Sequence, residues 1–382
     1  MIGVVADDLT GAAEIGAVGM RYGLRADVVV RGKPSGKADL VCIDTDSRGC
    51  SPAEARRRAA AAARLLCKSG ASWIYKKVDS VLRGPIVAEL EGVMDALRLS
   101  RALLVPANPS SGRVIRRGRY FISGKPIHQT EFARDPEHPR KSSEVLRLLG
   151  TSKPFPVRVC GVCDSFPDVG IIGGEAGSPS DLRQWADKRS SEILVAGGAE
   201  FFAALLAAEV GSHRTCCNGA SAKRRSSPRE LFVCGTASRS SREFVTSARA
   251  RGTPVFSLPR ELAKGGRLSA AEAEAIGQRV IAALGSHSRV ILNVGLPTVR
   301  DRAIAKRLAG HLVRVAESVL RQTEIRHVYA EGGTTSAELV RRMGWRRLTV
   351  VRELAPGVAT LAVESDSDFL LTIKPGSYVW PA

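Results

Sequence analysis

The chain repeatedly passes from a short apolar segment into a polar turn and then into a helix-like segment, and this alternation restricts the fold more than any other feature. A predicted strand over residues 2–6 runs directly into Asp7 and Asp8. A helix is predicted to follow over residues 12–22. The first half continues in the same way, with strands predicted at residues 26–30, 39–43, 73–77 and 102–105 and helices at 52–70 and 85–97. Strands that alternate with helices predict a doubly wound, largely parallel sheet.

The pattern restarts after a polar stretch at residues 218–228, which is rich in Ser, Lys and Arg. Beyond it, strands are predicted at residues 231–234, 290–294 and 327–330, with helices after Ser238, through Val319 and after Ser336. A chain of 382 residues suits two domains of ordinary size. We therefore predict an α/β protein with two domains, residues 1–222 and 226–382. Each is expected to have a largely parallel sheet flanked by helices, with an active-site cleft between the domains.

The chain is strongly basic, with 57 Lys and Arg residues against 38 Asp and Glu, a formal net charge of +19. Such a charge is compatible with binding nucleic acid or small anions. The arginines lie mostly in helix-like segments, and aromatic residues, 5% of the chain, are too few among them for base stacking. A solvated basic surface is the simplest interpretation, followed by an electropositive cleft for anionic substrates. We predict no nucleic-acid partner.

The sequence indicates neither a membrane protein nor a disulfide framework. No uninterrupted apolar run is long enough to span a bilayer, and the N-terminus lacks the order of a signal peptide, which predicts a cytoplasmic protein without a membrane partner. The eight cysteines are scattered, which favours reduced thiols. Cys160 and Cys163 have redox or metal spacing and could combine with Cys216 and Cys217. Buried structural thiols fit better, because a zinc site usually repeats the CxxC pair or adds histidines.

Two adjacent carboxylates at a strand end form the first candidate site. In open parallel sheets ligands bind at the carboxyl ends of strands, where Asp7 and Asp8 would lie. The alternative interpretation is that Asp8 only caps the helix that follows. A cap accounts for one aspartate but not for two, so both interpretations stay open.

The second candidate is the segment YKKVDSVLRG, residues 75–84, which also joins a predicted strand to a helix. Lys76, Asp79, Ser80 and Arg83 suit a polyhydroxylated anion. An arginine can bind a carboxylate through two N–H groups, while Asp and Ser take hydroxyls. The alternative is a capped helix with solvated charges.

A long segment at residues 108–142 contains many Gly, Pro, Arg and His residues with little periodicity. Irregular segments of this length inside a domain are usually functional, so it predicts a binding loop. Its residues 108–119 and 128–136 are polar enough to line the same site as residues 75–84. His128 alone is weak evidence, since most single histidines are surface residues.

Glycine and hydroxyl residues follow two strands of the second half. The sequence GGTTS at residues 332–336 and GTAS at 235–238 each lie between a strand and a helix, where phosphate oxygens can approach backbone amides. Each could be an ordinary capped turn, but two in one domain favour a nucleotide site, which KPGSY at 374–378 could close. There is no GxxxxGK[ST] and no usable GxGxxG, so neither a Walker-type nor a dinucleotide-binding fold is indicated.

Taken in order, the motifs ADDLTGA, YKKVDSVLRG, PANPSSGR, HQTEFARDP, GTAS, GGTTS and KPGSY resemble the four-carbon acid sugar kinase family over essentially the whole chain. The resemblance implies an ATP-dependent kinase with an N-terminal substrate domain and a C-terminal nucleotide domain. Such kinases phosphorylate the terminal hydroxyl of threonate, erythronate or 3-dehydrotetronate. The resemblance also implies a pathway that contains a dehydrogenase and an aldolase or decarboxylase. By this resemblance the ATP contacts would be Ser238, Gly332, Gly333, Thr334, Thr335 and Gly376, and the sugar acid would face Asp7, Asp8, Lys76, Asp79, Ser80 and Arg83.

Two motifs depart from the family pattern. Thr334 stands where the family commonly has Asp or Glu, and KPGSY stands where the family usually has a sequence like KSGNFG. The loss of a carboxylate bears on metal binding and is compatible with a divergent subgroup that acts on another small hydroxy acid. The sequence does not select one tetronate or an oligomeric state, and a homo-oligomer is compatible with it.

The expected cofactors are ATP and Mg²⁺, because phosphoryl transfer depends chiefly on positioning and charge neutralisation. An aspartate would orient or deprotonate the attacking hydroxyl. Asp8 is the first candidate and Asp79 the second, and the sequence does not separate them. The rival classes are a basic nucleic-acid-binding protein and a CxxC-dependent or metal-dependent hydrolase, neither of which explains the paired glycine loops.

Overall fold

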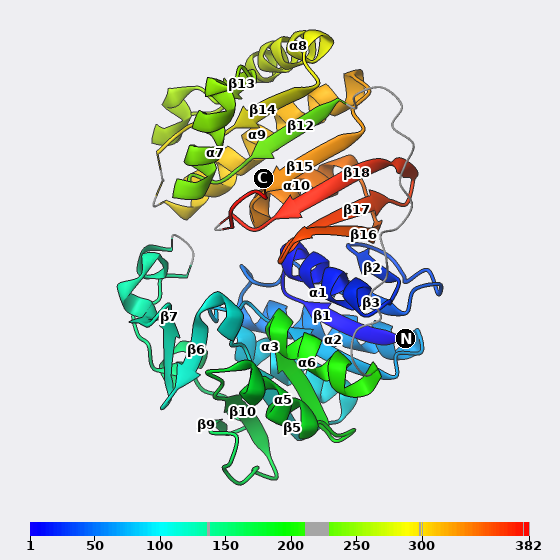
Figure 1. The fold of residues 1–382 in the computed structure, drawn as a ribbon, viewed down its shortest axis with the longest axis vertical. Coiled ribbons are helices and arrows are strands. Elements are labelled where there is room, and N and C mark those ends of the chain that lie inside the picture. Colours follow the sequence, from blue (N-terminus) through cyan, green and yellow to red (C-terminus); the bar gives the residue numbers. More distant parts are fainter. Residues whose placement is uncertain (136–137, 211–228, 298, 300, 377, 382) are drawn as a thin grey trace. The chain divides into compact units, whose positions relative to one another are not determined.

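The computed structural model in Figure 1 describes residues 1–135, 138–210, 229–297, 299, 301–376 and 378–381. The chain divides into two compact units, Met1–Cys216 and Cys217–Ala382. The polar stretch at residues 218–228, where the sequence predicts the domain boundary, lies outside the described residues. Among the helices of the described ranges, none combines the length and the apolar character needed to cross a bilayer.

Unit 1 contains a parallel sheet of eight strands within residues 1–210. Their spatial order is β2 (Ala26–Val29), β3 (Leu40–Asp44), β1 (Ile2–Ala6), β4 (Trp73–Lys77), β11 (Ile193–Gly197), β5 (Arg101–Val105), β10 (Gly170–Gly174) and β9 (Val157–Cys160). Strand β1 is paired in parallel with β3 on one side and β4 on the other. The residues that follow these three strands therefore lie at the same edge of the sheet, where ligands bind in folds of this kind.

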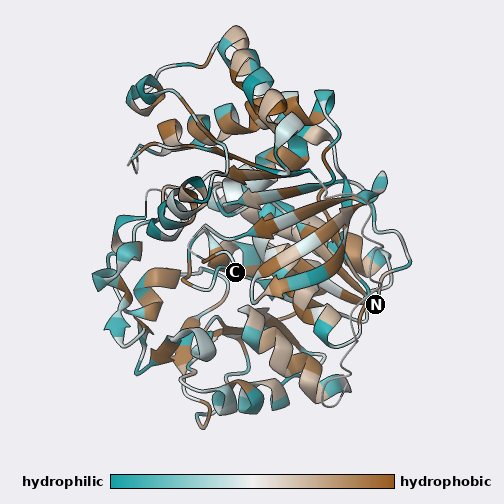
Figure 2. Ribbon diagram, turned by 45° about the horizontal axis from the view of Figure 1, so that its top comes forward, coloured by the Kyte–Doolittle hydropathy of each residue, from teal (hydrophilic) through white to brown (hydrophobic). Residues whose placement is uncertain are grey.

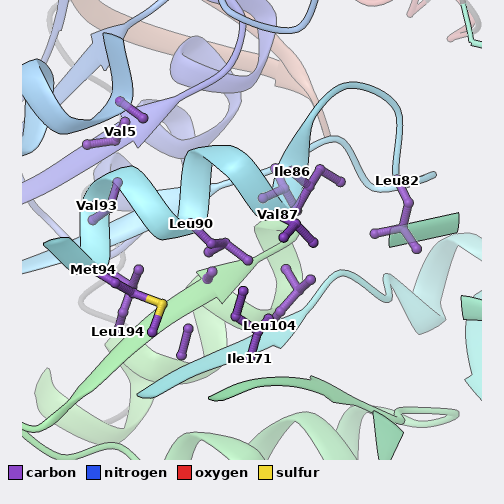
Figure 3. Packing of buried hydrophobic residues seen from close by; sticks show 14 of the residues in the cluster. Val5, Leu82, Ile86, Val87, Leu90, Val93, Met94, Leu104, Ile171 and Leu194 are labelled. Atoms are coloured by element: carbon purple, nitrogen blue, oxygen red, sulfur yellow. The ribbon is translucent and has the colours of Figure 1, made fainter. Parts of the chain in front are cut away.

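The helices of unit 1 pack in two groups. Helix α2 (Pro52–Lys68) packs against α3 (Ile86–Leu97), while α1 (Leu9–Arg21) and α5 (Pro179–Asp187) pack against α6 (Ala199–Val210). A stripe of buried apolar residues recurs at helical spacing on α3, at Ile86, Val87, Leu90, Val93 and Met94. Figure 3 shows this stripe beside Leu104 of β5, Ile171 of β10 and Leu194 of β11. This packing holds α3, and the loop before it, against the sheet.

The sequence Ser51-Pro52-Ala53-Glu54 has the pattern of a capping box with proline in the first turn, and the observed start of α2 differs from it in one detail. The Ser51 hydroxyl accepts a hydrogen bond from the Glu54 amide, and Pro52 occupies the first turn, as expected. The Glu54 carboxylate, however, accepts hydrogen bonds from Arg57 and Arg58. Three charge-assisted bonds from the two guanidinium groups take the place of the single bond to a backbone amide that would complete the box.

The segment 108–142 is more regular than its composition predicts. It contains a small antiparallel sheet of β6 (Arg113–Arg116), β7 (Arg119–Ile122) and β8 (Lys125–Pro126). The strands are joined by two-residue turns, Arg117-Gly118 and Ser123-Gly124, in which every φ is positive. Turns of this kind match the twist of a hairpin. The expectation of an irregular loop was therefore wrong for this part, because the turn signals are only two residues long; residues 136 and 137 lie outside the described residues.

Unit 2 has a mixed sheet. Its order is β13 (Val255–Ser257), β14 (Arg289–Asn293), β12 (Glu230–Cys234), β15 (His327–Glu331), β18 (Asp366–Lys374), β17 (Val358–Val363) and β16 (Arg347–Ala355). The strands from β13 to β18 in this order pair in parallel, and β18, β17 and β16 pair antiparallel. The sequence analysis missed the antiparallel strands, although Pro356-Gly357 is a turn signal between β16 and β17.

Helices and aromatic side chains cover the sheet of unit 2. Helix α9 (Arg302–Gln322) packs against α8 (Ala270–Ser286) and α10 (Gly333–Met343). On strands β12 and β15, Phe232 and Tyr329 stack with ring centroids 4.2 Å apart. Helix α7 (Arg239–Ala250) and Trp380 pack into the same cluster. Figure 2 shows that hydrophobic residues are concentrated on the strands.

Candidate active-site residues in the two units

Arg48 joins the carboxylates that follow β1 and β4 in unit 1. Its Nε donates to Asp7 Oδ2 at 2.7 Å, its Nη1 lies 2.8 Å from Asp8 Oδ2, and its Nη2 lies 3.7 Å from Asp79 Oδ1. Arg48 itself follows β3, which pairs with β1. The three strand ends thus bring one guanidinium and three aspartates together. Arg48 was not predicted from the sequence, although it follows the predicted strand 39–43 in the way that Asp7 follows the strand 2–6.

Asp8 caps helix α1 and also belongs to the group of carboxylates around Arg48. Its carboxylate accepts hydrogen bonds from the Gly11 amide at 2.7 Å and the Thr10 hydroxyl at 2.5 Å, so it caps α1. Burial would raise the pKa of Asp8, but the charges of Arg48 and Lys77 and the bonds within the cap lower it overall. The carboxylate is therefore ionised at neutral pH, suited to orienting a hydroxyl and weak as a proton acceptor.

Asp79 is held in the same ionised state. Burial alone would raise its pKa, but Arg83 and Arg48 bring the pKa well below its usual range. Asp7 is 1% exposed, and its Oδ1 accepts no hydrogen bond from any described residue. A buried carboxylate oxygen in this state fits a hydroxyl donor or a hard cation. Of the predicted acid-facing aspartates, Asp7 is the one with an oxygen left over.

The pKa of Asp44, at the end of β3, is shifted upward, whereas the pKa values of Asp8 and Asp79 are shifted downward. Burial, and repulsion by Asp46, Asp8 and Asp7, outweigh a hydrogen bond from the Asp46 amide and raise its pKa to about 8. Perturbed carboxyl groups of this kind are concentrated at functional sites. The sequence analysis missed Asp44 as well, although it directly follows the predicted strand 39–43.

Lys76 occupies a different place from the one predicted for it. Its ammonium lies 3.0 Å from Glu89 Oε2, and both side chains are at most 1% exposed. The Ser47 hydroxyl donates to the other oxygen of Glu89. The expectation that Lys76 faces the sugar acid conflicts with this burial. The physical reason is that successive residues of a strand point to opposite faces of the sheet, so that Lys76 and Lys77 diverge.

Lys77 is the lysine that belongs to the aspartate cluster. Its ammonium lies 3.2 Å from Glu14 Oε2 and donates to the Val78 carbonyl at 2.9 Å. Burial would lower its pKa, but Glu14, Asp7 and Asp8 raise it. Lys77 therefore stays charged beside the two aspartates and neutralises part of their charge.

Arg83 is also engaged within the protein. It donates to both oxygens of Asp79, at 2.9 and 2.8 Å, and to Asp135 Oδ2 at 3.0 Å. These contacts conflict with the expectation that Arg83 clamps the carboxylate of a substrate in two-pronged fashion, because the prongs already hold Asp79. Arg83 connects the 79–84 loop to residues 128–135 instead.

The segment 108–142 contacts the same loop at several further points. Arg113 Nη1 donates to the Ser80 hydroxyl at 2.5 Å, and the Tyr120 hydroxyl donates to the Ser80 carbonyl. Arg140 Nη1 donates to the Leu82 carbonyl at 2.6 Å. The structure thus brings this segment against residues 79–84, as expected from the sequence, and places the Arg113 guanidinium on the Ser80 hydroxyl.

In unit 2 the three glycine-containing segments follow β12, β15 and β18, which are neighbours in the sheet. Gly332 has φ +97°, a conformation that L side chains rarely adopt, and its amide donates to the Lys374 carbonyl at 2.9 Å. A Cβ on Gly235 would lie 1.8 Å from Thr335 Oγ1, and one on Gly376 would lie 3.2 Å from Thr236 Oγ1. The glycines therefore let the three segments pack directly on one another.

The predicted ATP contacts differ in accessibility. Thr334 is exposed and Gly332 and Gly333 are half-buried, whereas Thr335 is 2% exposed, with its hydroxyl toward Gly235. Ser238 is the N-cap of α7 and accepts from the Ser241 amide at 3.2 Å. The first amides of α10, at Gly333, Thr334 and Thr335, have no partner within the helix. This geometry suits phosphate through backbone amides and leaves the Thr335 side chain out of reach; Ser377 lies outside the described residues.

Within the described ranges, no group of three or more His, Cys, Asp or Glu side chains could hold a metal ion. Cys160 is half-buried and Cys163 exposed, and Cys216 and Cys217 lie outside the described residues. Mg²⁺ in kinases needs no such cage, because substrate phosphates and water supply most of its ligands. Oxygens of the nucleotide together with a single carboxylate of this protein would be a suitable set of ligands for Mg²⁺.

Comparison with protein families matches both halves of the chain. Residues 2–163 match a sugar-binding N-terminal domain, and residues 231–378 match a nucleotide-binding C-terminal domain. The crystal structure of a Salmonella typhimurium LT2 protein has a TM-score of 0.75 at 21% identity, covering 99% of this chain and 96% of that one. A Haemophilus influenzae structure has a TM-score of 0.69 at 22% identity, covering 98% and 96%. These two similarities establish the fold.

Curated relatives extend the comparison to function. A D-threonate kinase of Salmonella typhimurium is 25% identical, covering 98% of this chain and 94% of the relative. A 3-oxo-tetronate kinase of Methylobacterium radiotolerans is 26% identical over 99% and 96%. A D-erythronate kinase of Heliobacterium modesticaldum is 34% identical over 152 residues, 38% of this chain and 35% of the relative. The chain belongs to the four-carbon acid sugar kinase family, in which a sugar-binding domain precedes a nucleotide-binding domain.

Proposed function

We propose that the protein is an ATP-dependent kinase that phosphorylates the terminal hydroxyl of a four-carbon sugar acid: threonate, erythronate or 3-oxo-tetronate. The observation that carries the proposal is the contrast between the two strand-end edges. Unit 1 gathers Asp7, Asp8 and Asp79 around Arg48, a set of acceptors and a cation for a polyhydroxylated anion. Unit 2 gathers glycine loops and a helix start, which suit phosphate.

In this proposal residues 1–222 bind the acid and residues 226–382 bind ATP. The low pKa values of Asp8 and Asp79 favour a role in orienting the attacking hydroxyl over a role as a strong base. Such a role is sufficient, because the transition state of phosphoryl transfer is loose and catalysis rests on positioning and charge neutralisation. Mg²⁺ would supply charge neutralisation on the phosphates when bound. Asp7 Oδ1, with no hydrogen bond from the described residues, would accept a substrate hydroxyl or contact that cation.

The direct test is a coupled assay of ADP release with the full chain, ATP and Mg²⁺. Each of D-threonate, D-erythronate and 3-oxo-tetronate would be offered, beside other small hydroxy acids. We expect at least one acid to raise ADP release to a rate of about 1–100 s⁻¹, typical of kinases. The matched control is 2,3-dihydroxybutanoate, which keeps the carboxylate and two hydroxyls but lacks the terminal one. ADP release that no acid accelerates, or that the control accelerates equally, would contradict the proposal.

A further inference from the structure

A buried ion pair joins two of the glycine-containing segments of unit 2. Glu331 ends β15 and Lys374 ends β18, and the two residues are direct partners in the register of these strands. Lys374 Nζ lies 2.7 Å from Glu331 Oε1, and both side chains are 0% exposed. Burying two charges is costly unless they are paired with good geometry. The pair therefore needs a reason beyond stability.

Both charged groups are held inside the protein by contacts with other residues. The second oxygen of Glu331 accepts from the Ser241 hydroxyl of α7 at 2.6 Å. Lys374 Nζ donates to the Pro375 carbonyl at 3.0 Å and to the Tyr378 carbonyl at 2.5 Å, and it lies 5.2 Å from the centre of the Trp380 ring. Neither group is available to a nucleotide, so any effect on binding must act through the segments that the pair holds.

Those segments are the three that follow β12, β15 and β18. The Gly235 amide donates to the Glu331 carbonyl at 3.1 Å, and the Gly332 amide donates to the Lys374 carbonyl at 2.9 Å. The Ser240 hydroxyl donates to the Tyr378 carbonyl at 3.4 Å, the same carbonyl that Lys374 binds. One ion pair thus fixes the start of α7, the start of α10 and the C-terminal segment.

We propose that Glu331 and Lys374 are positioning residues that set the backbone of residues 235–238, 332–336 and 374–376 for nucleotide binding. The inference rests on the proposed function of unit 2. Removal of one charge leaves the other buried and uncompensated, and the segments must shift to hydrate it. A displacement of about 1 Å in a positioning shell can cost on the order of 100-fold in function.

The test compares Lys374→Met with Thr372→Val in the full chain. Thr372 lies on the same strand and face, is 0% exposed, and hydrogen bonds to Thr360 and His327, away from the glycine segments. Calorimetry would give the Kd for ATP, and thermal unfolding would give the stability of each variant. We expect Lys374→Met to raise the Kd about 10- to 100-fold and Thr372→Val to leave it within about twofold while lowering the Tm.

The outcomes separate the inference from the proposed function. Wild-type protein that binds no ATP contradicts the proposed function itself. Wild-type binding with an unchanged Kd in Lys374→Met, or with an equal rise in Thr372→Val, overturns the positioning role. If Lys374→Met fails to fold, the double variant Glu331→Gln with Lys374→Met removes both charges, which is far less costly than removing one. A raised Kd in that folded double variant supports the inference, and a wild-type Kd overturns it.

Discussion

The strand-end edges of the two units offer different chemistry to the ligands proposed for them. In unit 1 the edge is made of charged side chains, with Arg48 between three aspartates and Lys77 beside two of them. In unit 2 the strand-end edge is made of glycines, helix starts and hydroxyls. The ion pair of Glu331 with Lys374 is buried at the ends of β15 and β18. A site built from charged side chains should be sensitive to single charge changes and to pH. A site built from backbone amides should instead be sensitive to substitutions that fill the space between its segments.

The largest effect is expected from Arg48→Met. The variant leaves Asp7, Asp8 and Asp79 without their shared cation, and loss of one partner of a buried ion pair costs about 3–5 kcal/mol. Truncation of a buried charge pair in a binding site costs about 2–5 kcal/mol of binding free energy, so the kcat/KM for the sugar acid should fall about 10²- to 10³-fold. The Kd for ATP should stay at the wild-type value. Steady-state kinetics with each substrate varied, and calorimetry with ATP, measure the two effects.

Arg56→Met is the matched control for Arg48→Met. Arg56 pairs with Asp95 and Glu91, but its side chain is 44% exposed, and exposed pairs contribute about 0–1 kcal/mol. Its kinetics should match those of the wild type. Arg48→Lys keeps the charge but lacks the planar fork of N–H donors, so its kcat/KM should lie between those of Arg48→Met and Arg56→Met. An Arg48→Met enzyme with normal kcat/KM would remove the aspartate cluster from the acid site.

A smaller effect, on ATP binding and not on the sugar acid, is expected from Gly235→Ala. The added Cβ would lie 1.8 Å from Thr335 Oγ1 and 2.7 Å from Thr335 Cβ, so the first turn of α10 must move. Overpacking of this kind costs about 1–3 kcal/mol, and we expect the Kd for ATP to rise about tenfold with no change in the KM for the acid. Gly285→Ala is the control, because nothing lies within 4 Å of its added Cβ. An equal loss of affinity in both variants would mean that the space between residues 235 and 335 is unimportant.

The smallest effect concerns pH and belongs to unit 1. Asp44 has a folded-state pKa of about 8, above its ordinary value of 3.8. The folded protein therefore favours its protonated form, and the stability that this contributes is present below pH 4 and is lost as the pH rises through 8. Asp44→Asn mimics the protonated form. Its Tm should be close to that of the wild type at pH 5 and a few degrees higher at pH 9.

Asp39→Asn serves as the control for the pH effect. The Asp39 carboxyl is half-exposed, and a hydrogen bond from the Arg25 amide, with the Arg25 charge, lowers its pKa. Its stabilising contribution is lost only as the pH falls through that lowered value. The Tm difference of Asp39→Asn should thus be constant from pH 5 to pH 9. If Asp44→Asn also gives a constant difference, the Asp44 carboxyl is ionised throughout this range and the description of the cluster is wrong.

Much of the local structure could be predicted from the sequence. The strand over 73–77 was predicted at the bounds observed for β4, and those over 2–6 and 26–30 agree with β1 and β2 to within one residue. The helix cap at Ser238 and the glycine turn before α10 are local as well, since each is decided within a few residues by a hydroxyl or by φ. The antiparallel strands β16–β18 were missed although they pair with their neighbours in the sequence across short turns, one of them marked by Pro356-Gly357.

The sequence by itself determined where strands end and which polar residues follow them, because strand and helix signals depend on local periodicity and capping. Only the tertiary structure decided which charges meet. It paired Arg83 with Asp135, buried Lys76 against Glu89, and placed Arg48 between aspartates from two other strand ends. The physical reason is that an ion pair is set by the order of strands in the sheet and by the face to which each side chain points. Neither is encoded in the few residues around a motif.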